Sequence, residues 1–159
     1  MRKLKLQIQM TIDGFVAGPN GENDWVFSSG TPGPEALQEM IGFGVERAAG
    51  CDTILLGRKL AASGFCTYWE GVADNQPDNP WRPLAKLIAD HRKIVFSRSE
   101  TTLPGRNLEV ENGDLATVVQ SLKTNPARIS WFMAAPGLLA RSSALTLLMN
   151  IILSLTPLL

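Results

Sequence analysis

Residues 3–14, with the sequence KLKLQIQMTIDG, contain the pattern that decides the fold. Hydrophobic and polar residues alternate there, and the hydrophobic ones are Leu4, Leu6, Ile8, Met10 and Ile12. Alternation with a period of two predicts a β-strand with one buried face, because successive side chains of a strand point to opposite sides. Asp13-Gly14 then predicts a turn, since both residues suit tight turns.

Helices and strands are expected to alternate along the residues that follow. Hydrophobic residues at helical spacing predict a helix from Pro34 to a stop at Gly50. Residues 65–81 are rich in Pro, Asn, Gly and aromatic residues, and favour an irregular segment. The other expected elements are a buried strand at 53–56, a helix at 83–91, a strand at 93–96, a candidate strand at 107–110 and a helix capped by Asp114. This order predicts an α/β fold with a mostly parallel sheet and flanking helices.

The composition narrows the classes of partner and cofactor. The chain has 159 residues with 15 basic and 15 acidic ones, so its charge suggests neither nucleic acid nor a membrane surface as a partner. Cys51 and Cys66 lack metal-ligand spacing, and His91 is the single histidine. Buried reduced thiols in a cytoplasmic protein, with no metal site, are therefore expected. The basic N-terminus has no apolar stretch after it and does not match a secretion signal.

Ligands of parallel sheets bind beyond the carboxyl ends of the strands. The segments to search for chemistry are therefore residues 13–21, 57–59 and 97–98. The chain contains no GxGxxG sequence, no phosphate-binding P-loop and no nucleophile elbow.

Four stretches, in order and spacing, resemble the dihydrofolate reductase-like proteins. They are MTIDGFVAG at 10–18, ILLGRK at 54–59, Gly64-Phe65 with Tyr68-Trp69, and KIVFSR at 93–98. The resemblance is specifically to the group that shares its fold with the C-terminal reductase domain of the riboflavin-biosynthesis deaminase-reductase. No zinc deaminase motif precedes the domain, which favours a stand-alone reductase.

The resemblance implies NADPH as cofactor. In that family the Gly-Arg-Lys turn and the Ser-Arg pair hold the adenosine end, and an arginine fork suits the 2′-phosphate of NADPH. The cofactor-binding residues implied here are Val16, Ala17, Gly18, Gly57, Arg58, Lys59, Ser97 and Arg98. The alternative is that Arg58 and Arg98 are solvated cations of surface loops.

Asp13 is the candidate catalytic carboxylate. Hydride transfer to a C=N or C=O bond needs a proton donor or polarising group on the substrate side, and Asp13 ends the first strand. A turn role for Asp13, or a catalytic role for Glu39, are the alternatives. Trp25 and Tyr68 are candidates to bind a small pterin-like or ribosylaminopyrimidine-like heterocycle, or else they pack in loops. A non-catalytic nucleotide-binding domain is the second functional class.

Residues 129–159 differ in composition from the preceding domain, residues 1–128. No Asp or Glu follows Asp114, and residues 142–159 carry no charge. Where the family has a strand and a Gly-Gly pair that cradles the pyrophosphate, this chain has WFMAAPG at 131–137. Back-translation one nucleotide earlier permits Met-Val-Tyr-Gly-Gly-Ala-Gly, and residues 148–152 permit the family's Asp-Glu-Tyr-His.

The hypothesis is a frameshift at about residues 126–128, which leaves residues 1–128 as an incomplete domain and 129–159 as an out-of-frame tail. The last strands of the sheet are then missing or replaced, cofactor binding is impaired, and a homodimer is expected only of the intact form. A membrane anchor in the tail is the competing interpretation, because eighteen uncharged residues reach the lower limit for a span.

Overall fold

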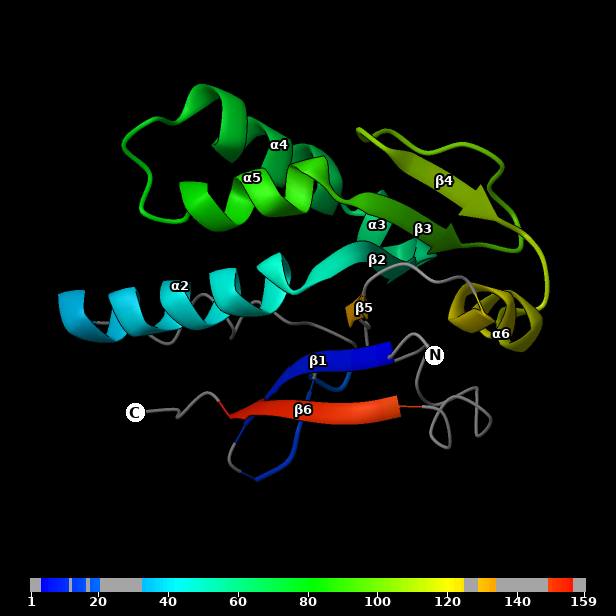
Figure 1. The fold of residues 1–159 in the computed structure, drawn as a ribbon, viewed down its shortest axis with the longest axis horizontal. Helices are drawn as coiled ribbons and strands as arrows, with labels where there is room; N and C mark the ends of the chain where they lie inside the picture. Colours follow the sequence, from blue (N-terminus) through cyan, green and yellow to red (C-terminus); the bar gives the residue numbers. More distant parts are fainter. Residues whose placement is uncertain are drawn as a thin grey trace.

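The computed structural model describes residues 4–11, 13–16, 18–20, 33–124, 129–133 and 149–155. Strands and helices alternate along the chain (Figure 1). The strands are β1 (Leu4–Met10), β2 (Cys51–Gly57), β3 (Arg92–Phe96), β4 (Leu108–Glu111), β5 (Ile129–Met133) and β6 (Met149–Leu155). The helices are α2 (Pro34–Ala49), α3 (Arg58–Ala62), α4 (Phe65–Asn75), α5 (Arg82–Asp90) and α6 (Leu115–Thr124).

The six strands form one sheet in the order β4-β3-β2-β5-β1-β6, and every pairing is parallel. This confirms the expected α/β fold with a mostly parallel sheet. Gly57 at the end of β2 pairs with Phe96 at the end of β3, which pairs with Glu111 at the end of β4. The carboxyl ends of these three strands therefore lie side by side at one edge of the sheet.

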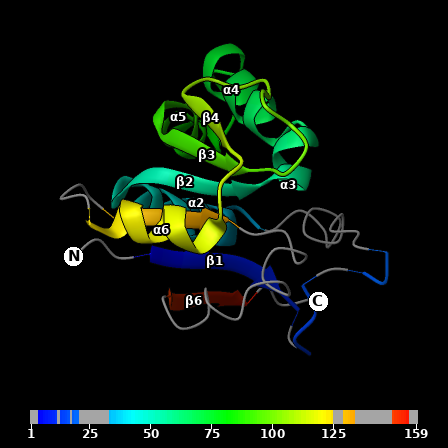
Figure 2. The same cartoon turned by 90° about the vertical axis from the view of Figure 1, so that its right-hand side faces the viewer.

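Both faces of the sheet are covered, as a hydrophobic run in a parallel strand requires. Ile54 and Leu56 of β2 belong to a core cluster with residues of α2 and α5, whereas Leu55 joins a second cluster with Val119 of α6. Figure 2 shows α6 in front of the sheet and α2 behind it. Cys51 and Cys66 are both buried, as expected.

Helices α2 and α6 confirm two sequence predictions. Pro34 begins α2, where its missing N–H leaves no helical hydrogen bond unmade, and Gly50 follows its last residue. Asp114 caps α6, because its carboxylate accepts the backbone N–H of Thr117 at 3.0 Å. Hydrogen bonds to the backbone and side chain of Thr117 hold the pKa of Asp114 below its usual value.

The prediction of an irregular segment at residues 65–81 was wrong. Phe65–Asn75 form the helix α4, and only residues 76–81 connect it to α5. Thr67, Tyr68 and Gly71 are weak helix formers, so local preference opposes this helix. It forms because Val72 and Ala73 are buried against α5 and tertiary packing outweighs propensity.

The structure shows that strands are present in residues 129–159. Tail residues supply β5, which lies between β2 and β1, and β6, which pairs with β1 at the edge. Main-chain pairing requires only extended residues with free N–H groups, and neither Ile129–Met133 nor Met149–Leu155 contains proline. The expectation that these strands are lost is therefore corrected.

No helix among the described residues is long and apolar enough to cross a membrane.

Candidate functional site

The carboxyl edge of β2 and β3 carries two basic segments that are far apart in sequence. Gly57 ends β2 and α3 begins at Arg58, while Ser97 and Arg98 directly follow β3. Arg58 is half-buried, and Lys59 and Arg98 are exposed. None of these three cations forms an ion pair or a hydrogen bond with another described residue through its side chain. Basic residues at one edge of a sheet suit an anionic group.

The turn that carries Arg98 is held by several hydrogen bonds. The buried Ser97 hydroxyl accepts the backbone N–H groups of Ser99, at 3.2 Å, and Glu100, at 2.8 Å. The Ser97 N–H donates to the carbonyl of Glu111 at 3.1 Å, which joins the turn to β4. Arg98 therefore extends from a fixed backbone into solvent.

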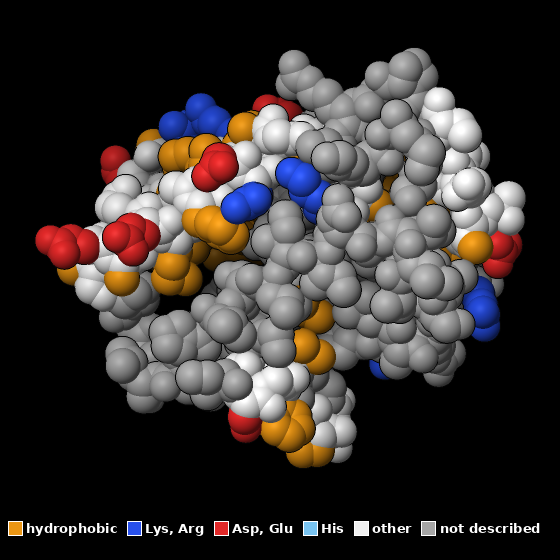
Figure 3. Space-filling model, turned by 60° about the horizontal axis from the view of Figure 1, so that its bottom comes forward, with side chains coloured by type: hydrophobic (Ala, Val, Ile, Leu, Met, Phe, Trp, Pro, Cys, Tyr) orange, Lys and Arg blue, Asp and Glu red, His pale blue; other side chains and the backbone are white. Residues whose placement is uncertain are grey.

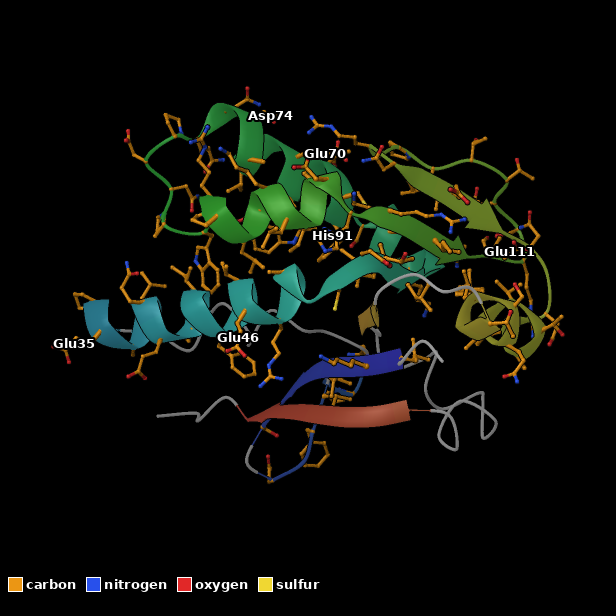
Figure 4. The ribbon with its side chains drawn as sticks, viewed as in Figure 1. Glu35, Glu46, Glu70, Asp74, His91 and Glu111 are labelled. Atoms are coloured by element: carbon orange, nitrogen blue, oxygen red, sulfur yellow. The ribbon has the colours of Figure 1, made fainter. Side chains whose placement is uncertain are left out.

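The acidic groups at the same edge are engaged locally. The Glu111 carboxylate accepts the backbone N–H of Gly113 at 2.9 Å, and Asp114 caps α6. Figure 4 shows Glu111 at the end of β4 beside α6. Because Asp114 occupies the N-terminus of α6, the basic turns, and not that helix end, are the candidate anion site at this edge.

Asp13 lies in a turn that its own neighbours stabilise. The buried Thr11 hydroxyl donates to the Asp13 carboxylate and accepts the backbone N–H of Phe15 at 2.9 Å. Gly14 has a φ of 91°, a left-handed conformation that glycine adopts without strain. The Asp13 side chain is exposed. This geometry accommodates the turn role, and leaves one face of the carboxylate open to solvent.

The predicted site residues do not all come together. Figure 1 shows the turn after β1 well apart from the ends of β3 and β4 and from α4, which carries Tyr68. Tyr68 is 58% exposed and packs edge-to-face on Trp69, with ring centroids 5.4 Å apart. Strands twist relative to their neighbours by roughly 20–25°, and β5 and β2 separate β1 from β3. Asp13 and Arg98 therefore follow strands that two other strands separate.

The remaining predicted residues have other surroundings. Val16 is half-buried and packs against the core cluster that contains Leu4 and Ile8, and Gly18 is half-buried. Ala17 and Trp25 lie outside the described residues. Glu39 is exposed on α2, as a solvated helix residue would be.

Two residues with clear structural roles were missed by sequence reasoning. Asn112 donates both hydrogens of its side-chain amide to the turn after β3, at the carbonyls of Ser97, 2.9 Å, and Glu100, 2.8 Å. Its position between a strand end and the helix cap Asp114 was the available signal. Lys93 lies inside an apolar strand, and a charge in a buried run was the signal there.

The Lys93 side chain is fully buried. Its ammonium donates to the carbonyls of Ala89, at 2.8 Å, His91, at 3.0 Å, and Arg106, at 3.0 Å. An ammonium has three donors, so all three are used. Burial lowers the pKa of Lys93, and burial raises the pKa of the nearby Cys66 thiol. This arrangement ties α5, β3 and the loop before β4 together.

In the part of the chain that the structure describes, the charges elsewhere do not form a second anion site. Glu70 and Asp74 lie on α4 (Figure 4), where Glu70 accepts the backbone N–H of Arg106 and Asp74 pairs with its guanidinium. On the face in Figure 3, the described Lys and Arg side chains are scattered among acidic ones. Among the described residues, no group of His, Cys, Asp and Glu side chains is placed to hold a metal ion.

The sequence matches the model of one known protein family. The model of the RibD C-terminal domain matches residues 2–147. The chain belongs to the RibD C-terminal domain family. The RibD resemblance expected from the sequence is thereby confirmed.

Relatives in this family cover the chain almost completely. The uncharacterized protein YyaP of Bacillus subtilis (strain 168) is 28% identical over 156 residues, which is 98% of this chain and 75% of YyaP. The RibD structure from Acinetobacter baumannii superposes with a TM-score of 0.60 at 17% identity and covers 100% of this chain. The chain spans about half, 47%, of that RibD chain. The likeness shows that the RibD fold is shared.

Proposed function

We propose that this RibD-like domain descends from an NADPH-dependent reductase that transfers hydride to a small heterocycle, pterin-like or ribosylaminopyrimidine-like. The observation that carries the proposal is the pair of basic turns at the ends of β2 and β3, whose cations have no partner among the described residues. Family membership supports the reductase class. The buried thiols of Cys51 and Cys66 fit a cytoplasmic location.

The residues present fit the adenosine end of NADPH. Gly57, Arg58 and Lys59 on one side, and Ser97 and Arg98 on the other, would hold it, because a guanidinium fork suits a phosphate monoester. An extended dinucleotide along the carboxyl edge would pass β5 and reach the turn after β1. NADPH supplies the hydride when bound, and Asp13 would polarise or protonate the substrate there.

We also propose that residues 129–159 are out of frame and that cofactor binding by this chain is impaired. Met133 at the end of β5 is level with Leu56 of β2 and Gln7 of β1. The residues after Met133 therefore follow the strand between the two ends of the proposed cofactor site. In the family this is the place of the Gly-Gly pair, and here the sequence is Ala134-Ala135.

Replacing Arg98 by glutamine is expected to weaken binding of 2′,5′-ADP about tenfold and to leave binding of 5′-AMP unchanged. Hydrogen bonds to charged groups contribute about 1.5–3 kcal/mol, and 1.4 kcal/mol corresponds to a factor of ten. Both probes carry the 5′-phosphate and differ only in the 2′-phosphate, so an effect of the tail on the 5′-phosphate cancels in the comparison. Isothermal titration calorimetry measures both dissociation constants.

Arg92→Gln is the matched control for Arg98→Gln. Arg92 begins β3 at the opposite end of the strand, and its guanidinium pairs with Glu109 at 2.7 Å. This variant is expected to bind 2′,5′-ADP as the wild type does. Equal affinities of wild type and Arg98→Gln for 2′,5′-ADP would refute the proposed cofactor position.

A non-catalytic nucleotide-binding domain is the second candidate, and the hydrogen bond from Thr11 to Asp13 favours it, since Asp13 then serves the turn. Steady oxidation of NADPH with a dihydropterin, or with the ribosylaminopyrimidine of the riboflavin pathway, separates the two. We expect slow oxidation of NADPH, measured as the loss of its absorbance. Asp13→Asn is expected to lower the rate further. NADPH binding without any oxidation would identify a binding domain.

A further inference from the structure

We propose that Asn112 is a positioning residue that sets selectivity for a 2′-phosphate by holding the turn that carries Arg98. The proposal rests on the proposed function, because it assigns the selectivity of the same adenosine site. Asn112 follows β4, the strand next to β3, and so reaches the turn from a neighbouring strand. It would act through Arg98 and is not expected to contact the cofactor.

The turn of residues 97–100 is fixed at both ends by one side chain. The Nδ2 group of Asn112 donates one hydrogen to the Ser97 carbonyl, at 2.9 Å, and the other to the Glu100 carbonyl, at 2.8 Å. Both acceptors are carbonyl oxygens, which identifies the amide nitrogen as the atom that faces them. The Ser97 hydroxyl closes the turn from inside by accepting the N–H groups of Ser99 and Glu100.

Arg98 lies between the two residues that Asn112 binds. Its side chain is exposed and forms no hydrogen bond or ion pair with another described residue, so the backbone of the turn sets where its guanidinium begins. Ordering a loop on binding costs free energy, and a loop that is already ordered avoids most of that cost. Asn112 therefore raises affinity for a ligand that Arg98 binds, without a contact of its own.

Loss of Asn112 is not expected to unfold the protein. Asn112 is exposed and the Glu100 carbonyl that it binds lies at the surface, so water can replace the lost amide there. The Ser97 N–H would still donate to the Glu111 carbonyl of β4. The expected consequence is a mobile turn on an intact sheet.

The chain offers a matched control at the other end of the same strand. Asn107 precedes β4, is also exposed, and donates its side-chain amide to a backbone carbonyl, that of Asp90, at 3.0 Å. In Figure 4, Glu111 marks the end of β4 near α6, and Asn112 is the next residue. His91 marks the start of β3, well away from Glu111, and Asp90 is the residue before it. A change at Asn107 removes the same kind of hydrogen bond far from Arg98.

The test measures the dissociation constants of 2′,5′-ADP and 5′-AMP by calorimetry for the wild type, Asn112→Ala, Asn112→Asp and Asn107→Asp. Asn112→Ala is expected to weaken the binding of 2′,5′-ADP about tenfold, or by about 1.4 kcal/mol. The dissociation constant of 5′-AMP is expected to change less than about twofold. Asn112→Asp, whose carboxylate cannot donate, is expected to lose at least as much. Asn107→Asp should keep the wild-type ratio of the two constants. Thermal melting of each variant checks that the sheet is folded.

The outcomes separate this inference from the proposed function. If Arg98→Gln weakens 2′,5′-ADP and Asn112→Ala does not, Asn112 has no positioning role, and the cofactor site stands. If Asn112→Ala binds 2′,5′-ADP as tightly as the wild type and only Asn112→Asp binds it weakly, the added negative charge alone causes the loss. That result also overturns the inference. If Arg98→Gln itself has no effect, both proposals fail. An equal loss for both ligands in Asn112→Ala indicates a general structural role and contradicts selectivity.

Discussion

A chain that continues after residue 128 in the alternative frame, with Met-Val-Tyr-Gly-Gly-Ala-Gly, is expected to bind NADPH roughly 10- to 100-fold more tightly than the present chain. The strand β5 ends at Met133, which pairs with Gln7 of β1 and Leu56 of β2, and β5 lies between the strands that carry the basic turns and the strand that precedes Asp13. Glycines there allow backbone N–H groups to approach a pyrophosphate closely. One such hydrogen bond to a charged group contributes about 1.5–3 kcal/mol, and each 1.4 kcal/mol is a factor of ten.

Quenching of protein fluorescence by NADPH measures the effect on both chains. The matched control keeps the present frame and changes only Ala134 and Ala135 to glycine, which tests the pair of glycines without the rest of the alternative tail. If the present chain already binds NADPH as tightly as the alternative one, the proposed impairment is wrong. An unbroken frame for Trp131–Leu159 in the resequenced gene would contradict the frameshift itself.

Replacing Lys93 by methionine is expected to lower the free energy of unfolding by about 2–4 kcal/mol. Methionine fills a similar volume but leaves the carbonyls of Ala89, His91 and Arg106 without their donor. A buried polar group without a partner costs about 1–3 kcal/mol, and the charge that no longer has to be desolvated offsets part of the loss. Since domains are stable by only about 5–15 kcal/mol, urea denaturation should show the change directly.

Lys86→Met is the control for that prediction. Lys86 lies on α5, is exposed, and its side chain forms no hydrogen bond or ion pair with another described residue. Its replacement is expected to change the free energy of unfolding by less than about 0.5 kcal/mol. Equal effects of the two substitutions would show that the three hydrogen bonds of Lys93 contribute nothing to stability.

Elements with a clear hydrophobic period were predictable from the sequence, and α4 was not. The alternation in residues 3–12 predicted β1, and the helical spacing after Pro34 predicted α2. Helix α4 contains residues that disfavour helices, and its burial against Ala85 and Ala89 of α5 is a tertiary contact between two helices. Local preference cannot report such a contact, so the sequence suggested a loop.

The candidate site shows the same division. The basic turns after β2 and β3 were predictable, because a parallel sheet brings carboxyl ends of strands to one edge. The role of Asn112 was not, since it depends on which strand lies next to β3. Nor did the sequence indicate that Tyr68 on α4 and Asp13 after β1 would lie apart (Figure 1).

The sequence by itself determined the α/β class, the strand of residues 4–10, the family resemblance and the abrupt change of composition after Arg128. These features are written in local periodicity and in short motifs, which need no knowledge of distant contacts. The tertiary structure alone decided that Ile129–Met133 lies in the middle of the sheet, between β2 and β1. Main-chain hydrogen bonds between parallel strands are nearly independent of side-chain identity, so strand order follows from how the whole chain packs. Because β5 lies between β2 and β1, the changed residues that follow it are at the centre of the proposed cofactor site.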